Sequence, residues 1–174
     1  MNNFHERGSS MIEVLIAMVV IAFGLLGFVG MQSQAVATQI EGYQRSQALI
    51  LINDISARIS LNSNNAVNYV SNNIGITSPG DCNTKVTRAD KVLCEWTLLL
   101  QGSAEFEGTA KLGAMLGARA CISSPGADVY LISIAWQGIR PSGAPANSCG
   151  QGAYTDENVR RTVTTVLQIP RLSS

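Results

Sequence analysis

The pattern of apolar positions begins with an uncharged run from Val14 to Met31, directly after a single acidic residue, Glu13. Eighteen residues of this kind are enough to cross the hydrocarbon core of a bilayer as an α-helix. Residues 1–8 leave no room for the apolar core and cleavage site of an ordinary secretory signal peptide. We therefore expect residues 14–31 to stay in the mature protein as one transmembrane helix.

The helical pattern continues beyond this run, since no charge occurs before Glu41 and no proline interrupts the chain. Apolar side chains recur on one helical face that is broken at Gln47, and these are Val36, Ile40, Tyr43, Leu51, Ile55 and Ile59. We predict one helix over residues 9–61, roughly 80 Å long at 1.5 Å per residue. Because this exceeds what a bilayer needs, its distal half is expected to pack on a soluble domain.

Two acid-then-base pairs lie four residues apart on this distal half, Glu41 with Arg45 and Asp54 with Arg58. That spacing supports an exposed helix surface, so we assign these pairs no chemical role.

Three glycines, Gly24, Gly27 and Gly30, recur every three residues inside the apolar run. Such a row permits close approach of a second helix in a membrane. It also softens the helix locally, by about 1 kcal/mol per glycine relative to alanine. The sequence leaves both interpretations open.

The remaining residues, 62–174, are expected to form one small globular domain with an antiparallel sheet, which gives an α+β fold. Residues 62–81 hold six asparagines and are predicted as a connecting loop. A short helix from Ala89, or a strand from Trp96 to Leu100, follows, and the signal is weak from Gly102 to Gly117. Alternating patterns predict strands within 128–137 and 159–169, and 118–124 is a candidate third strand. The loop 137–154 is expected to be long and exposed.

Composition and charge exclude several classes of function. The formal net charge is zero, without a basic patch, so nonspecific nucleic-acid binding is not expected. The only histidine is His5, and no CxxC motif occurs, so we expect no metal site and no cofactor. Motifs for hydrolase, nucleotide-binding or metalloprotease chemistry are missing from the sequence, and we expect no enzyme activity.

Four cysteines, an even number, all follow the apolar segment, which suggests disulfides in an oxidising compartment. Three connectivities are possible. We favour Cys82 with Cys94 and Cys121 with Cys149, because each pair closes a local polar loop.

Specific residues at the start of the chain resemble a known family. Arg7-Gly8, four further residues, Glu13 and an unbroken apolar helix are similar to the class III leader and N-terminal helix of type IV pilins and pseudopilins. The segment SMIEVLIAMVVIAFGLLG most resembles the corresponding segment of PilV-like minor pilins, also called type IV pilus modification proteins. Further similar blocks occur around Trp96, at 135–138, at Cys149 and at 161–163.

The resemblance implies a set of roles for these residues. A prepilin peptidase would cut after Gly8, leaving 1–8 as the leader, and would methylate the new amino terminus at Ser9, where the family usually has Phe or Met. Glu13 would meet the amino terminus of a neighbouring subunit, because a buried ion is tolerable only when paired. A carboxylate in the first turn would also be favoured by the helix dipole.

The resemblance further implies a minor pilin in the tip complex that primes pilus assembly, and hence adhesion or twitching motility. Its partners would be the major pilin, other minor pilins and a possible tip adhesin. It would lie in the inner membrane, with a periplasmic C-terminal domain, before assembly and at the pilus tip afterwards. The alternatives are a type II secretion pseudopilin and a static membrane-anchored periplasmic binding domain with loop 137–154 as its ligand surface.

Overall fold

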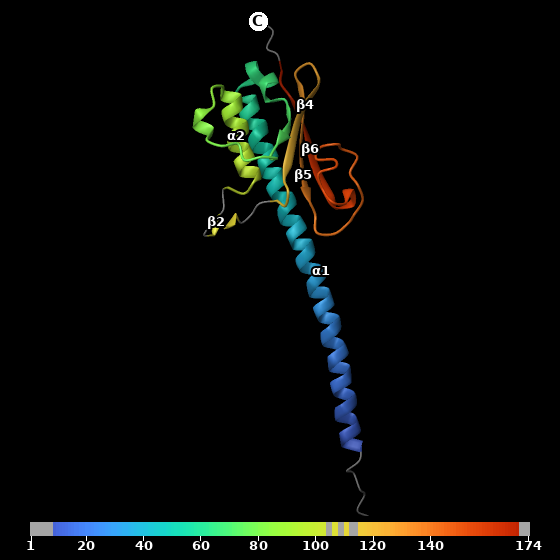
Figure 1. Cartoon of the computed structure of the whole chain (residues 1–174). Helices are drawn as coiled ribbons and strands as arrows, with labels where there is room; N and C mark the ends of the chain where they lie inside the picture. Colours follow the sequence, from blue (N-terminus) through green and yellow to red (C-terminus); the bar gives the residue numbers. More distant parts are fainter. Residues whose placement is uncertain (1–8, 104–105, 108–109, 112–114, 171–174) are drawn as a thin grey trace, which may run out of the picture. The chain divides into compact units, whose positions relative to one another are not determined.

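The computed structural model describes residues 9–103, 106–107, 110–111 and 115–170 (Figure 1). The chain divides into two compact units, 1–40 and 41–174, and each is described by itself. One helix, α1 (Ser9–Ser60), contributes residues to both units. The prediction of a long N-terminal helix is confirmed.

The second unit is built around a four-stranded sheet in the order β1-β4-β5-β6, with antiparallel neighbours throughout. Its strands are β1 (Ser71–Ile74), β4 (Arg119–Gly126), β5 (Val129–Gln137) and β6 (Arg160–Gln168). A separate two-stranded ribbon consists of β2 (Phe106–Glu107) and β3 (Ala110–Lys111). The α+β class with a small antiparallel sheet is therefore confirmed, and so are the two strands that the alternating patterns predicted and the candidate third strand before them.

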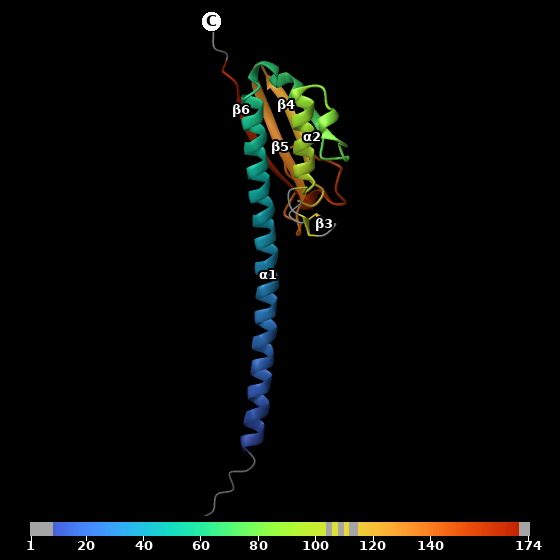
Figure 2. The same cartoon turned by 90° about the vertical axis from the view of Figure 1, so that its left-hand side faces the viewer.

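One face of the sheet is covered by two helices that lie side by side, the distal part of α1 and α2 (Arg88–Leu100) (Figure 2). Thr87 caps α2, since its hydroxyl accepts a hydrogen bond from the backbone N–H of Asp90 at 3.0 Å. The capped start and the apolar face of 89–100 decide between the two alternatives for this segment, and the helix is confirmed.

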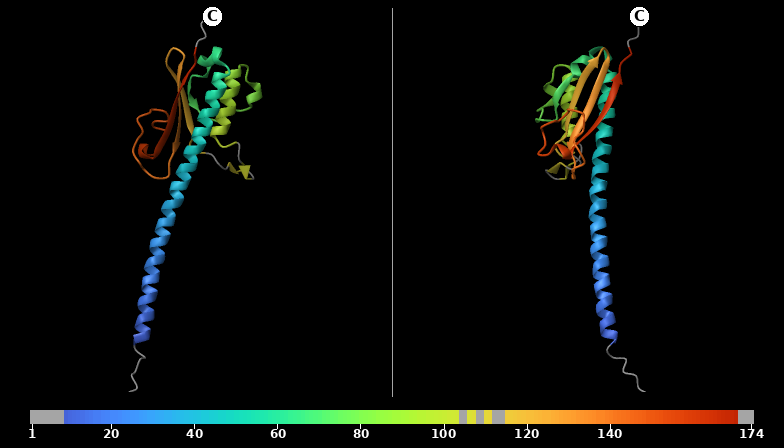
Figure 3. Two further views of the ribbon diagram at one scale, coloured as in Figure 1. Left: turned by 180° about the vertical axis from the view of Figure 1, so that it is seen from behind. Right: turned by 90° about the vertical axis from the view of Figure 1, so that its right-hand side faces the viewer.

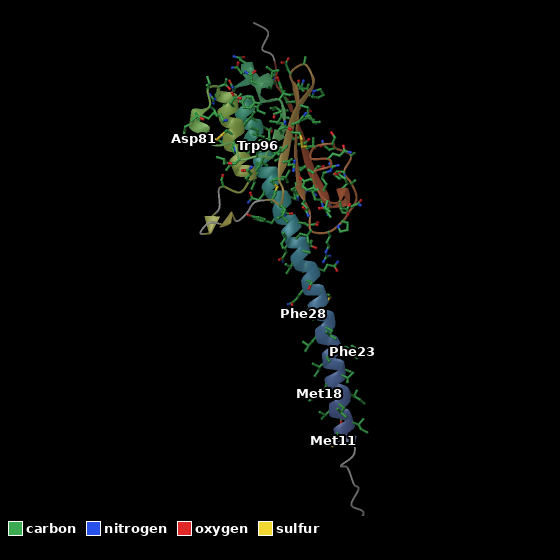
Figure 4. All side chains as sticks on the ribbon, in the orientation of Figure 1. Met11, Met18, Phe23, Phe28, Asp81 and Trp96 are labelled. Carbon is green, nitrogen blue, oxygen red and sulfur yellow. A yellow bond between two sulfur atoms is a disulfide. The ribbon has the colours of Figure 1, made fainter. Side chains whose placement is uncertain are left out.

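The core lies between these helices and the sheet. Trp96 of α2 is fully buried, and its indole N–H donates to the carbonyl of Leu51 on α1 at 3.0 Å. Figure 4 shows Trp96 inside this domain. Trp136 of β5 is 3% exposed. Both tryptophans are therefore core residues, as aromatic side chains of this size usually are.

The buried face of distal α1 differs from the predicted one. Its buried residues follow a spacing of four, four, three and four, and these are Gln44, Ala48, Ile52, Ile55 and Ile59. Tyr43, which the prediction placed on the core face, is 46% exposed, and Leu51 is only half-buried. Ile55 and Ile59 are buried as predicted. The prediction was wrong for the rest of the face because large apolar residues were weighted over the small Ala48, which is 0% exposed.

The segment 62–81 is more regular than the predicted loop. It contains a 3₁₀ helix, η1 (Ser63–Tyr69), and the strand β1. Tyr69 and Ile74 are buried, and β1 pairs with β4 through Ser71 opposite Ile122 and Ile74 opposite Ala120. At β1 the prediction was wrong because the edge of β4 supplies hydrogen bonds that an asparagine-rich composition does not reveal. Residues 75–81 contain no helix or strand, as predicted.

The return from β5 to β6 crosses the sheet face that lies away from the helices (Figure 3). It ends in a short 3₁₀ helix, η3 (Glu157–Val159). Contrary to the expected exposure, Gly138 and Cys149 within it are buried. This segment is therefore partly packed on the sheet.

Candidate functional sites

The first candidate site is the N-terminal part of α1. Every large apolar side chain from Met11 to Met31 is at least 53% exposed, on all sides of the helix. Figure 4 labels Met11, Met18, Phe23 and Phe28 along it. A helix that is apolar all round needs an apolar environment on every side, such as lipid or other helices. By length and composition α1 includes a segment that can cross a membrane, with a mean hydropathy of 2.7 over the best window.

The predicted processing residues lie at the start of this helix. Ser9 is the first residue of α1, and Gly8 lies outside the described residues. Glu13 is the fifth residue of α1 and is exposed, so it belongs to the second turn, and the first turn holds no acid. The expected support from the helix dipole is corrected accordingly, since that effect falls off beyond the first turn.

No cation pairs with Glu13 within the described part of the chain. A carboxylate in an apolar helix surface is costly to bury alone and calls for an opposite charge. Any such charge has to come from outside the described residues.

The glycines of the row cause no break in α1. A Cβ added at Gly24, Gly27 or Gly30 would meet nothing within 4 Å. Contacts inside the first unit therefore do not require glycine here. The choice between close helix approach and local softness stays open.

The second candidate site is a polar hollow of about 450 Å³ on the sheet face that lies away from the helices. It opens between β1, β4, β5 and the segment 147–153, which a disulfide between Cys121 and Cys149 joins to the sheet. Amide, hydroxyl and guanidinium groups supply its polar lining, from Asn72, Arg119, Ser123, Ser133, Asn147 and Gln151. We call this surface the polar hollow.

Two disulfides lie in the second unit. Cys121 of β4 is bonded to Cys149, and Cys82 of the short 3₁₀ helix η2 (Cys82–Thr84) is bonded to Cys94 of α2. These are the pairs that the sequence analysis favours. Among the described residues no cysteine is free.

A buried arginine holds the loop that carries Cys149. The Arg160 side chain is 3% exposed and donates to the backbone carbonyls of Pro145, Asn147 and Cys149. Its charge is balanced by Glu157. The backbone N–H of Gly152 and the Arg160 side chain both bind this carboxylate and lower its pKa. Spacing alone gave no signal that Arg160 holds this loop, because its partners in the loop are backbone carbonyl groups.

Asn147 fixes the same loop to the sheet. Its amide donates to the hydroxyl groups of Ser133 at 2.9 Å and Thr164 at 3.3 Å, and its carbonyl oxygen accepts from the N–H of Cys149. Nearby, Tyr154 donates to the carbonyl of Gly117 at 2.9 Å, and burial raises the pKa of its hydroxyl to about 12. Hydrogen bonds of Asn147 thus hold the wall of the polar hollow to the sheet, and the bond of Tyr154 ties the residues that follow this wall to Gly117.

The pairing of Glu41 also differs from prediction. In place of Arg45, Glu41 binds the guanidinium of Arg161 at 3.2 Å and the backbone N–H of Arg140 at 3.3 Å. The partners are separated by up to 120 residues, so sequence spacing could not reveal them. The second pair forms as predicted, with Arg58 to Asp54 at 2.8 Å, and Glu95 of α2 joins it at 3.1 Å.

The lining of the polar hollow includes no acid and no histidine, and its two cysteines are bonded to each other. Nucleophilic catalysis needs an activated nucleophile beside a base. Within the described residues, no three potential metal ligands from His, Cys, Asp and Glu lie together.

Comparison with known proteins gives one result at the start of the chain. Residues 3–29 match the model of the prokaryotic N-terminal methylation motif. Comparison with curated proteins and with solved structures gave no match.

The motif covers residues 3–8 of the predicted leader and the first part of α1, where the exposed apolar surface lies. It supports a type IV pilin-like protein, either a pilin or a pseudopilin, and it implies processing by a prepilin peptidase and assembly with other pilins. Such a motif indicates a structural protein rather than an enzyme. The apolar helix behind the leader fits membrane anchoring.

Proposed function

We propose that this protein is a PilV-like minor pilin of a type IV pilus, a subunit of the tip complex that primes assembly. The observation that carries the proposal is the coincidence of the methylation motif at 3–29 with a continuous helix whose apolar side chains are exposed on every side. A surface of this kind serves first as a membrane anchor and then as the contact between subunits in a filament core.

In this proposal a prepilin peptidase cuts after Gly8 and methylates the amino group of Ser9. Mass spectrometry of the amino-terminal peptide, from protein expressed in its native host, tests this step. A chain that starts at methylated Ser9 is expected. A chain that retains Met1 would contradict the proposal and favour a static anchored binding domain.

Glu13 sets the register between neighbouring subunits during assembly through its charge. Its carboxylate pairs with the amino terminus of a neighbouring subunit, so that two charges in an apolar environment neutralise each other. This role is consistent with its exposure on α1 and the lack of an ion-pair partner within the described residues.

Glu13→Ala is expected to leave the protein stable and membrane-bound while lowering the number of pili, counted by electron microscopy. Gln32→Ala, which removes an exposed polar side chain of the same helix, is the matched control and should assemble normally. Normal surface piliation in the Glu13 variant would count against the registry role.

Before assembly the protein spans the inner membrane once through residues 14–31, with its C-terminal domain in the periplasm, and afterwards it lies at the pilus tip. Its partners are the major pilin and other minor pilins, and a tip adhesin is a further candidate. The polar hollow and the disulfide-closed loops supply the contacts of the globular domain. No cofactor is part of this proposal.

A gene deletion separates a pilus from a secretion system, since pilins and pseudopilins share the motif. Loss of twitching motility with normal levels of secreted enzymes is expected. Loss of enzyme secretion with normal motility would instead identify a pseudopilin.

A further inference from the structure

The sheet has two edges, and they differ. β1 is a four-residue strand whose pairing with β4 shifts register. β6 has nine residues in unbroken register with β5. Short or irregular edge strands resist pairing with another chain, whereas long regular ones invite it. The β6 edge is therefore the one that can accept a further strand.

Two hydrogen bonds show which backbone groups of β6 face the open edge. At the ends of the ladder, the N–H of Ile169 donates to Asp128 at 2.9 Å, and the N–H of Gly138 donates to Val159 at 2.7 Å. Hydrogen-bonded pairs alternate with non-bonded pairs in an antiparallel ladder. Because the register is unbroken between these two bonds, the backbone N–H and C=O groups of the odd-numbered residues of β6 form the hydrogen bonds to β5. The N–H and C=O groups of Thr162, Thr164, Val166 and Gln168 then point to the open edge.

No backbone partner for these outward groups occurs within the described residues. The stretch 162–168 also lacks charged residues and proline, which commonly protect an edge. Two arginines precede it, but Arg160 is buried in the loop and Arg161 is bound to Glu41. Neither is available to repel an incoming strand.

The core-facing side chains of β6 are incompletely covered. Val163 and Leu167 are half-buried, whereas Ile132 and Ile134 of the neighbouring strand β5 are 0% exposed. On the other face Val166 is 63% exposed. A fifth strand with alternating apolar residues would cover Val163 and Leu167 and satisfy the outward backbone groups.

We propose that the open edge of β6 accepts an extended, uncharged segment from a different subunit of the filament as a fifth strand. This inference rests on the proposed function, because it takes its partner from the filament. Segments of this chain outside the described residues do not fit, since those after residue 103 have at most four residues. Residues 1–8 would be removed by processing.

A second copy of the chain is the other possible occupant. Antiparallel self-pairing centred on Thr164 would satisfy the outward groups of two copies at once. Such a contact is isologous and closes as a dimer, whereas a filament grows through heterologous contacts. The proposed function therefore selects a different subunit.

Val166→Pro tests the edge, because it removes an outward N–H and leaves the hydrogen bonds to β5 in place. Val166→Ala keeps that N–H and is the matched control. In purified filaments we expect at least a tenfold loss of the Val166→Pro protein and normal amounts of the Val166→Ala protein. Denaturation of full-length protein in detergent, followed by tryptophan fluorescence, shows whether the variant domain folds. If the Val166→Pro domain does not fold, the Val166→Lys variant is used instead. The same loss from purified filaments is expected, because a charge would then lie against the incoming strand.

A photo-crosslinking amino acid at Gln168 of β6 identifies the occupant. The control position is Val86, which is 97% exposed in the loop between η2 and α2. In purified filaments we expect an adduct with a different subunit from Gln168, and its loss when Val166→Pro or Val166→Lys is added. A homodimer adduct would overturn the choice of partner, and normal incorporation of the folded variant would overturn the edge contact. A wild-type chain that is missing from filaments altogether would instead contradict the proposed function.

Discussion

The two parts of α1 obey different physical rules although they form one continuous helix. From Met11 to Met31 the large apolar side chains are exposed on all sides, and the described residues of the first unit offer them no core. From Gln44 to Ile59 a single narrow face is buried against the sheet and α2. The first part therefore depends on surroundings outside the chain, whereas the second is stabilised by the chain itself.

Matched substitutions of isoleucine give the largest expected difference between the two parts. Ile55 is 0% exposed and Ile21 is 60% exposed. Ile55→Ala should lower the free energy of unfolding of the domain by about 2 to 5 kcal/mol, because it leaves a cavity. Ile21→Ala should change it by about 0.5 kcal/mol or less. Chemical denaturation of full-length protein in detergent, followed by tryptophan fluorescence, measures both, and equal losses would refute the comparison.

Removal of a disulfide should act on the second unit alone. The Cys121–Cys149 bond spans 28 residues, so the paired change to serine is expected to cost about 3.5 kcal/mol of stability. The Cys82–Cys94 bond spans 12 residues and should cost slightly less, about 3 kcal/mol. Denaturation midpoints rank the two variants. Both variants should stay in the membrane fraction. If either variant left that fraction, membrane attachment through the N-terminal part of α1 would depend on the second unit.

Surface ion pairs on distal α1 should matter much less than its buried face. Arg58 binds Asp54 and Glu95, which raises the pKa of the guanidinium, but its side chain is 34% exposed. Arg58→Met is expected to cost about 0.5 to 1 kcal/mol, and the loss should shrink at high salt. Denaturation at two salt concentrations checks this. A loss as large as that of Ile55→Ala would mean that charge, not packing, holds the distal half.

The smallest expected effect is a change in pH dependence at Glu157. The pKa of this carboxyl is lowered from 4.5 in the folded state by the N–H of Gly152 and by Arg160. Its contribution to stability is therefore present above pH 4.5 and is lost as the pH falls through the folded pKa. Glu157→Gln should flatten the fall in stability below pH 4.5, as measured by denaturation midpoints. If the Glu157→Gln variant lost stability below pH 4.5 as steeply as the wild type, Glu157 would not make this contribution.

Sequence patterns succeeded where the controlling interactions are local. The apolar run of α1 and the alternation in β5 and β6 predicted their elements, and the apolar spacing from Ala89 gave the helix α2 as one of two alternatives. They failed where a distant residue decides, as at β1, which needs β4 as its partner, and at Glu41, which binds Arg161. The polar hollow was missed because Asn147 and Arg160 act through backbone carbonyls and hydroxyl groups. Such partners leave no periodic signal.

The order of the cysteines along the chain has a consequence for biogenesis. The first cysteine is bonded to the second and the third to the fourth, so neither loop encloses or crosses the other. A chain that emerges amino terminus first into an oxidising compartment presents each cysteine next to its correct partner before the following pair appears. Sequential oxidation then yields the native connectivity without reshuffling by thiol–disulfide exchange. Maturation of this domain is accordingly expected to be independent of a disulfide isomerase.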